Sequence, residues 1–273
     1  MNRFQPLLAA VLAAATFVAA AEPAPLTLEK ALQIAAQRPP EMLLAATRGL
    51  PLRLMASPST TGIAAADAAR LELMARFFEV ILTDMDAVAS GERMSVAYGH
   101  WDRLKARDPE SAETLRANLL YRDLLSRRNA AQMNQRLARS GLALAMGQAG
   151  KLSPELVEPE FPANDPGSAP DILQPAAPSR GTSAAASMLE HAHTAAMLEL
   201  DWLLRSERPR ARARIDLAGR LLDDAREQLA AGGPSDLGNA MAATVEAKRD
   251  ELSVEFAIQL ARAKLAALTR ARK

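Results

Sequence analysis

The chain has 273 residues, among them 59 Ala and 40 Leu but only 8 Val and 6 Ile, and its 33 basic side chains nearly balance 32 acidic ones. This composition excludes a chain that is disordered throughout, and the absence of Cys excludes disulfide scaffolds and cysteine-based zinc sites. Few β-branched residues beside many Ala and Leu argue against an all-β protein and predict an all-α one.

Residues 1–21 are typical of a cleaved secretory signal peptide, with Arg3 before an apolar run over residues 7–18 and three alanines before Glu22. The run is too short to span a membrane comfortably, although an uncleaved anchor or an Ala-rich helix start is the alternative. Cleavage would leave equal numbers of acidic and basic residues, which argues against nucleic-acid binding. We therefore expect secretion across the inner membrane, to the periplasm or the outer membrane.

Residues 22–62 are predicted to form a short helix followed by a linker. Thr27 suits the N-cap of a helix over residues 26–46, which Pro39 and Pro40 should interrupt or kink. Residues 49–62 are rich in Pro, Ser and Thr, which favours a linker.

Residues 63–150 are predicted to form a first antiparallel helical hairpin. Its first helix, over residues 64–107, has apolar residues at coiled-coil spacings of 3 and 4, namely Leu71, Met74, Phe78, Ile81, Met85 and Val88. A second stripe of Leu73, Phe77 and Val80 indicates more than one neighbour. The pair Asp108 and Pro109 should end this helix. The next helix, over residues 109–146, has its own apolar positions, namely Leu115, Leu119, Leu120, Leu124, Met133 and Leu137.

Residues 151–182 read as a Pro-rich linker and residues 183–273 as a second helical hairpin. Pro209 should interrupt or kink the first helix of this hairpin, and the glycines at 232 and 233 should end it. Ser235 or Asp236 can then cap a final helix that runs to about residue 270. We therefore expect long antiparallel hairpins with coiled-coil packing and little or no β-strand.

Several stretches resemble the TolC-like outer membrane efflux proteins. Residues 26–32 (LTLEKAL) are similar to the opening of the mature chains in that family. Residues 69–80 and 94–103 are similar to the first long helix of one of its branches. Residues 235–242 and 261–268 are similar to the start and the end of the last long helix. These pieces are spread along most of the length of the mature chain.

The resemblance implies a homotrimer whose hairpins form a periplasmic tunnel, with no enzymatic step and no cofactor. In the family, a periplasmic adaptor protein docks at a hairpin tip and links the tunnel to an inner-membrane pump. Family members also contribute barrel strands, which alternate apolar and polar residues over about 10 positions. We find no such segment in this sequence, so the barrel strands are expected to be missing.

By this resemblance, the turn between the last two helices is the candidate partner-binding site. It comprises Gly232, Gly233, Ser235, Asp236 and Leu237. Its glycines allow close backbone approach and its polar residues offer hydrogen bonds, but a plain turn between two capped helices is the alternative. The first tip, around Asp108, lacks the family's Gly.

Other candidates have simpler explanations. A basic run could bind nucleic acid or a membrane surface, but its alternate spacing favours a solvated helix face; it comprises Arg208, Arg210, Arg212, Arg214 and Arg220. His191 and His193 point in different directions on a helix and are too few for a zinc site. Trp101 and Trp202 are expected to pack between helices.

The sequence thus predicts a non-catalytic helical component of an export system. A soluble periplasmic scaffold or binding protein without a pore is the alternative. A small enzyme is a third hypothesis. A phosphate-binding loop, a nucleophile elbow and an HExxH motif are all missing from the sequence, and long helical hairpins offer little concave pocket, so a non-catalytic protein is predicted.

Overall fold

The computed structural model describes residues 25–52, 62–148, 155–161, 184–231 and 236–272. Its helices are α1 (Leu28–Ala35), α2 (Pro40–Thr47), α3 (Ala65–Arg107), α4 (Ala112–Ala145), α5 (Ala184–Trp202), α6 (Arg208–Ala230) and α7 (Leu237–Ala271). A π-helical turn, η1 (Leu203–Glu207), joins α5 to α6. These ranges contain no β-strand, only an isolated parallel bridge between Leu26 and Leu156. The predicted all-α fold is confirmed.

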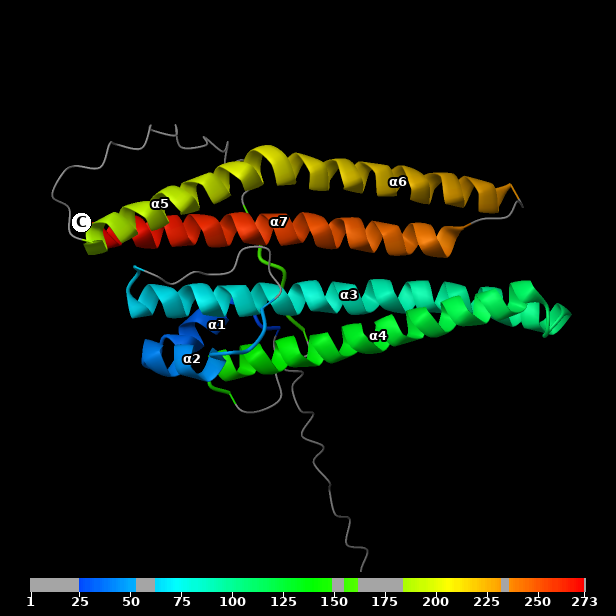
Figure 1. Ribbon diagram of the computed structural model, residues 1–273, viewed down its shortest axis with the longest axis horizontal. Coiled ribbons are helices and arrows are strands. Elements are labelled where there is room, and N and C mark those ends of the chain that lie inside the picture. The colour runs from blue at the N-terminus through cyan, green and yellow to red at the C-terminus, as the bar shows by residue number, and fades with distance from the viewer. Residues whose placement is uncertain (1–24, 53–61, 149–154, 162–183, 232–235, 273) are drawn as a thin grey trace, which may run out of the picture.

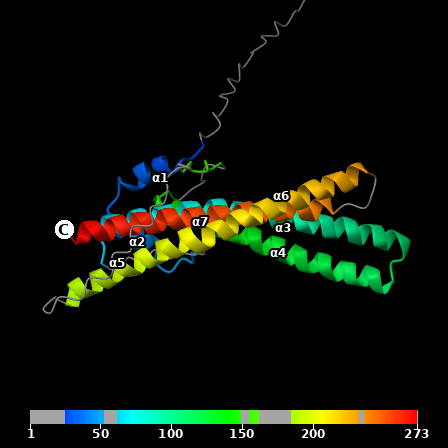
Figure 2. The same cartoon turned by 90° about the horizontal axis from the view of Figure 1, so that it is seen from above.

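The long helices form a single row in the order α4, α3, α7 and α5–α6 (Figure 1). α3 contacts α4 on one side and α7 on the other, and α7 in turn contacts α5 and α6. Figure 2 shows this row from above, with α1 to one side of it. The two edges of the row are therefore α4 and α5–α6.

The main core lies where α3 meets α7 and the C-terminal half of α4. Phe77, Phe78 and Phe256 are completely buried, and the rings of Phe78 and Phe256 stack with their centroids 4.3 Å apart. Phe161, from the segment that precedes the second hairpin, contacts both stacked rings edge-on. The two hairpins are thus packed against each other through a shared aromatic cluster.

The apolar stripe predicted for the second helix does not face α3, its partner in the hairpin. Most of its large residues are exposed, Leu119 to 72%; the exposed members are Leu115, Leu119, Leu120, Met133 and Leu137. α4 instead contacts α3 mainly through small side chains such as Ala117, Ala131 and Ala138, together with Leu142. Small residues let the backbones of two helices approach closely, which explains why α3 packs on the alanines of α4. The sequence spacing thus identified an apolar stripe on α4 but did not indicate that this stripe faces away from α3.

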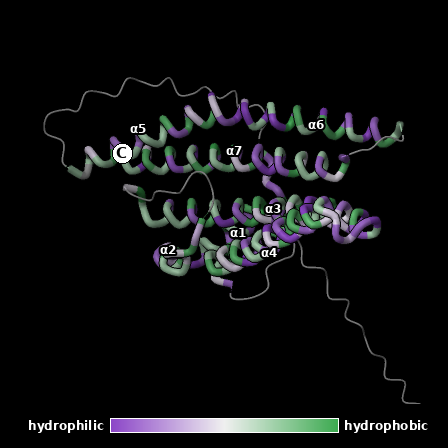
Figure 3. Tube along the Cα trace, turned by 45° about the vertical axis from the view of Figure 1, so that its right-hand side comes forward, coloured by the Kyte–Doolittle hydropathy of each residue, from purple (hydrophilic) through white to green (hydrophobic). Residues whose placement is uncertain are grey.

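The predicted coiled-coil seam of α3, the apolar residues at spacings of 3 and 4 from Leu71 to Val88, is buried over only part of the helix. Leu71, Met74, Phe78 and Ile81 are buried, whereas Val88 is 55% exposed. The second stripe of Leu73, Phe77 and Val80 is completely buried, which confirms that α3 has more than one neighbour. Figure 3 shows apolar and polar residues interleaved along all the long helices.

Pro209 does not interrupt the first helix of the second hairpin. The helix runs on through η1, whose π-helical turn ends one residue before Arg208 and two before Pro209. Pro has no backbone N–H to donate to the preceding turn, and the wider π turn accommodates that loss without breaking the rod. The rod bends at this point (Figure 1), so of the two predicted effects of Pro209 the kink is present and the interruption is not.

The short N-terminal helices agree with the sequence pattern. The Thr27 hydroxyl accepts a hydrogen bond from the Lys30 backbone N–H, as expected of an N-cap. The Pro39–Pro40 pair separates α1 from α2, as predicted. α4 begins at Ala112 rather than at 109, because Ser111 accepts the capping hydrogen bond from the Thr114 N–H. Among the helices described, none is long and apolar enough to cross a membrane.

Candidate functional site

The predicted partner-binding turn lies at one end of the row, between α6 and α7. Gly232, Gly233 and Ser235 fall outside the described residues. Asp236 occupies the N-cap position of α7, but its side chain makes no capping hydrogen bond and instead accepts one from the Asn239 side-chain amide at 2.6 Å. Leu237 is the first helical residue and is partly exposed. Asp236 therefore presents an exposed carboxylate at this tip.

A glycine beside this turn was missed by the sequence analysis. Gly238 lies against Val96 of α3, and a Cβ at this position would collide with the Val96 Cγ2 atom. The start of α7 thus touches α3 directly, which fixes where the second tip lies relative to the first hairpin. The only sign of this close approach in the sequence is that Gly238 is a glycine within a predicted helix, just after a glycine-rich turn.

The first tip, between α3 and α4, uses its polar groups internally. The Asp108 carboxylate accepts from the Glu110 backbone N–H at 3.2 Å. The Thr114 hydroxyl donates to the Asp108 carbonyl at 2.6 Å. This tip is a self-satisfied turn, and the second tip therefore remains the better candidate for docking.

The basic run of α6 is more than a solvated face. Arg208 pairs with Glu255 of α7 at 2.6 Å, Arg214 pairs with Asp250 of α7, and Arg210 pairs with Glu207 at 2.9 Å. The ion pairs of Arg208 and Arg214 hold α6 to α7, whereas that of Arg210 lies within the η1–α6 rod. Together they neutralise much of the positive charge. A phosphate-rich partner would have to compete with carboxylates that are already in place.

An open cleft of about 620 Å3 lies beside these ion pairs, between α6, α7 and the segment 155–161. Its charged lining alternates in sign, with Arg208, Arg212, Lys248, Glu158, Glu251 and Glu255 among its residues. Such a lining has no strong preference for an anion or a cation. A second groove, of about 550 Å3, lies between α1, α2 and the start of α3, and is mainly apolar.

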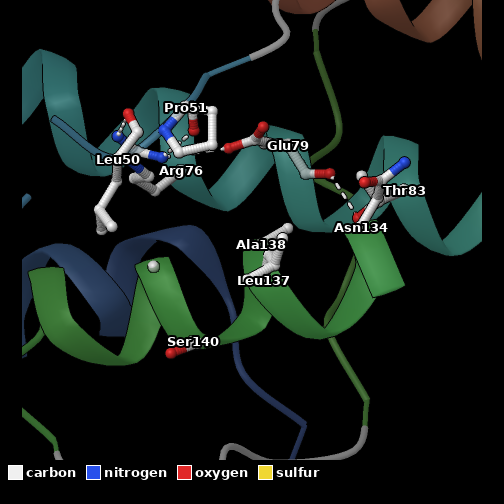
Figure 4. A pocket seen from close by; sticks show the side chains of 10 residues that line it. Leu50, Pro51, Arg76, Glu79, Thr83, Asn134, Leu137, Ala138 and Ser140 are labelled. Atoms are coloured by element: carbon white, nitrogen blue, oxygen red, sulfur yellow. Dashed lines mark hydrogen bonds and ion pairs between the residues drawn. The ribbon is translucent and has the colours of Figure 1, made fainter. Parts of the chain in front are cut away.

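A buried polar cluster fastens the end of the α2 segment to α3 (Figure 4). Arg76 is almost fully buried, and its guanidinium donates to the Pro51 carbonyl at 2.6 Å and to the Leu50 carbonyl at 3.0 Å. Glu72 and Glu79, one turn away on either side, pair with the same guanidinium at 2.9 and 3.4 Å. The adjoining cavity measures only about 70 Å3. Because Arg76 is fully engaged, this cluster is best explained as a structural clamp.

The histidines do not form a metal site with other residues that the structure describes. No group of three or more His, Asp or Glu side chains could hold an ion within those ranges. His193 Nε2 lies 3.5 Å from the Thr269 hydroxyl of α7, and burial together with the charge of Arg272 lowers the pKa of this imidazole. Asp84 and Asp86, two acidic residues close together on α3, do not form an acid pair, because Asp84 pairs with Arg139 of α4 and Asp86 pairs with Arg249 of α7.

The two tryptophans differ. Trp101 stacks on Tyr121 of α4 with ring centroids 5.3 Å apart, and Tyr98 contacts both rings edge-on. The prediction of packing between helices is confirmed for Trp101. It is wrong for Trp202, which is 47% exposed where α5 meets η1, because α7 covers only one side of this outer rod.

The comparisons with known proteins give no relative: no protein-family model, curated protein or solved structure matches the chain. The resemblance to TolC-like proteins thus depends on the quoted stretches of sequence alone.

Proposed function

We propose that the chain is a non-catalytic, TolC-like component of an envelope export system. The observation that carries this proposal is the row of two long antiparallel hairpins packed side by side. Long helices that pack side by side in one row can line a tunnel, which is the arrangement that a helical conduit requires. The resemblance of residues 26–32, 69–80 and 235–242 to the family supports the same function.

The proposed partners are a periplasmic adaptor protein, which would dock at the second tip, and through it an inner-membrane pump. Asp236 supports this role because its carboxylate is exposed and is not used as a helix cap. The proposed location is the periplasmic side of the outer membrane, after cleavage of residues 1–21.

Cell fractionation of the full-length protein tests the proposal. We expect recovery with the outer membrane, resistance to a salt wash and release by detergent as an oligomer. Recovery in the soluble periplasm would overturn the export role. It would favour the alternative, a soluble periplasmic scaffold without a pore.

A substitution at the tip tests adaptor docking separately. Asp236→Arg should abolish cross-linking of the tip to an adaptor protein identified by mass spectrometry, because it reverses the exposed charge at the contact. Glu110→Arg, at the first tip, should leave that cross-link unchanged. Circular dichroism should show the same helicity for both variants. An undiminished cross-link in Asp236→Arg would mean that this turn connects α6 to α7 and does not bind the adaptor protein.

A further inference from the structure

The groove between α1, α2 and the start of α3 has the size of a small-molecule site. The two short helices lie beside that end of α3 (Figure 1), and the groove between them measures about 550 Å3. Ligand pockets usually have volumes of about 300–1,000 Å3. Most of the lining is apolar, namely Leu32, Ala35, Ala36, Pro40, Leu43, Ala66, Ala69 and Leu73. Such a lining favours a ligand with a hydrocarbon body over a polar one.

The helices that form the groove are fixed in place by polar contacts. Before α1, the Leu26 backbone N–H donates to the Glu155 carbonyl at 3.1 Å. Between α1 and α2, the Arg38 guanidinium donates to the Gly147 carbonyl at 2.7 Å. Beyond α2, the buried Arg76 guanidinium binds two backbone carbonyls of the segment that follows. The groove is therefore held in shape without a ligand, as is usual for small-molecule sites.

Arg70 of α3 supplies an uncompensated positive charge at this groove. It lines the groove and is exposed to solvent. Its guanidinium has no ion pair and no side-chain hydrogen bond with any residue that the structure describes. Ala66, four residues earlier, and Leu73, three residues later, lie on the same face of the helix. The free cation thus lies directly beside the apolar lining.

The other charges of the groove also favour an anion. Arg38 adds a second guanidinium to the lining, and its bond to the Gly147 carbonyl uses only one of five N–H donors. Asp67 is the one acidic residue among the described residues of the lining, and its carboxylate pairs with Arg270 of α7 at 2.6 Å. The positive charge of Arg70 is therefore not cancelled within the groove.

We propose that this groove binds a fatty acid, a ligand with one hydrocarbon chain and a carboxylate head. The chain would lie against Leu43 and Leu73, which are buried at the groove, and the carboxylate would pair with Arg70. A guanidinium suits this head because it can donate two parallel hydrogen bonds to one carboxylate. A cationic head would be repelled, and an alcohol would leave the charge of Arg70 without a partner. The inference uses this groove alone and does not depend on the proposed export role.

Calorimetric titration of the purified full-length protein with decanoate tests the site. The ligand is kept at concentrations at which it does not form micelles. We expect saturable binding at one site per chain. Decanol and decyltrimethylammonium have the same hydrocarbon chain without the negative charge, and each should bind at least about tenfold more weakly.

Arg70→Gln tests the recognition of the carboxylate. It should weaken the binding of decanoate on the order of tenfold and leave the binding of decanol unchanged, because only the charged head loses its partner. Arg48→Gln is the matched control. Arg48 is an exposed arginine at the end of α2, outside the lining of the groove, and its substitution should leave the affinity for decanoate unchanged.

Ala66→Trp tests the position of the hydrocarbon chain. Ala66 is exposed and lines the groove, so an indole at this position would fill the space and should abolish the binding of decanoate and decanol alike. Ala45→Trp places the same ring on an exposed position of α2 outside the lining and should change neither affinity. Thermal melting should show that every variant stays folded.

Three outcomes would overturn the inference. The first is a protein that shows no saturable binding of decanoate. The second is equal affinity for decanoate and decanol, which would mean that no positive charge recognises the head. The third is undiminished binding in Arg70→Gln or in Ala66→Trp, which would mean that the ligand binds elsewhere. None of these outcomes depends on where the protein fractionates in cells.

Discussion

At the scale of single residues, Gly147 is a position where the backbone requires a glycine. It ends α4 with a φ of 67°, in the left-handed region, and its carbonyl accepts a hydrogen bond from the Arg38 guanidinium at 2.7 Å. A Cβ at this position would overlap that guanidinium. The glycine therefore both ends the helix and lets the α1–α2 segment reach it.

Gly147→Ala should lower the free energy of unfolding by about 1–2 kcal/mol, because it forces a residue with a Cβ into the left-handed region, whereas the flexible end of the Arg38 side chain can move away from the added methyl group. Urea denaturation measures this change. Gly99→Ala is the control, since Gly99 lies inside α3 with open space around it, and this change should stabilise the helix by roughly 0.5–1 kcal/mol. Equal effects of the two substitutions would contradict the interpretation.

His193 gives the protein a pH-sensitive contact between α5 and α7. Its pKa is lowered in the folded state by burial and by Arg272, so the unfolded chain takes up a proton more readily. Stability should therefore fall as the pH drops through about 6.5 and below, where the unfolded state is protonated first.

The melting temperature should fall between pH 7.5 and pH 5, and His193→Gln should reduce that fall. His191→Gln, on the exposed side of the same helix, should retain it. A fall of the same size in both variants would show that other groups cause the pH dependence.

At the scale of elements, the ends of helices could be predicted because they depend on local chemistry. Proline at 39 and 40, the Thr27 cap and the Asp108 region each act within one turn, and the limits of α3 agree with the prediction to within one residue. The direction of the α4 stripe could not be predicted, because it depends on which neighbour approaches. Of the candidate tip, the sequence indicated Asp236, but it gave no sign that Gly238 fixes the tip against Val96.

The α3 seam is testable by comparing two of its predicted positions. Phe78→Asp should lower the free energy of unfolding by about 4 kcal/mol or more, because it buries an unpaired charge and removes the ring that stacks on Phe256. Val88→Asp should cost less than about 1 kcal/mol, since Val88 is largely exposed in the folded chain. Thermal and urea denaturation of both variants measures these changes. Equal losses of unfolding free energy in the two variants would mean that burial does not differ along the seam.

At the scale of the whole molecule, α7 joins the two hairpins. It packs against α3, α5 and α6, and its Phe256 completes the core around Phe78. Ion pairs from Asp67 to Arg270 and from Arg93 to Glu246 bind it to α3 near both ends of the contact. Removing α7 should therefore damage both halves of the molecule at once.

A chain that stops after residue 231 should lose cooperative melting and bind a dye for exposed apolar surface, because Phe77 and Phe78 lose their cover. Adding a peptide of residues 236–272 should restore at least part of the cooperative transition. A truncated chain that melts as sharply as the full one would show that the first hairpin is an independent folding unit.

The Phe78–Phe256 stack also sets an order of events during synthesis. The first hairpin emerges from the ribosome early and can form from local contacts, but the ring that covers Phe78 is among the last parts of the chain to be made. Until then, the apolar face of α3 is open to solvent and to other nascent chains. A long-range contact of this kind slows the final folding step. A chain with this delay depends on chaperones until α7 has been made and can cover α3.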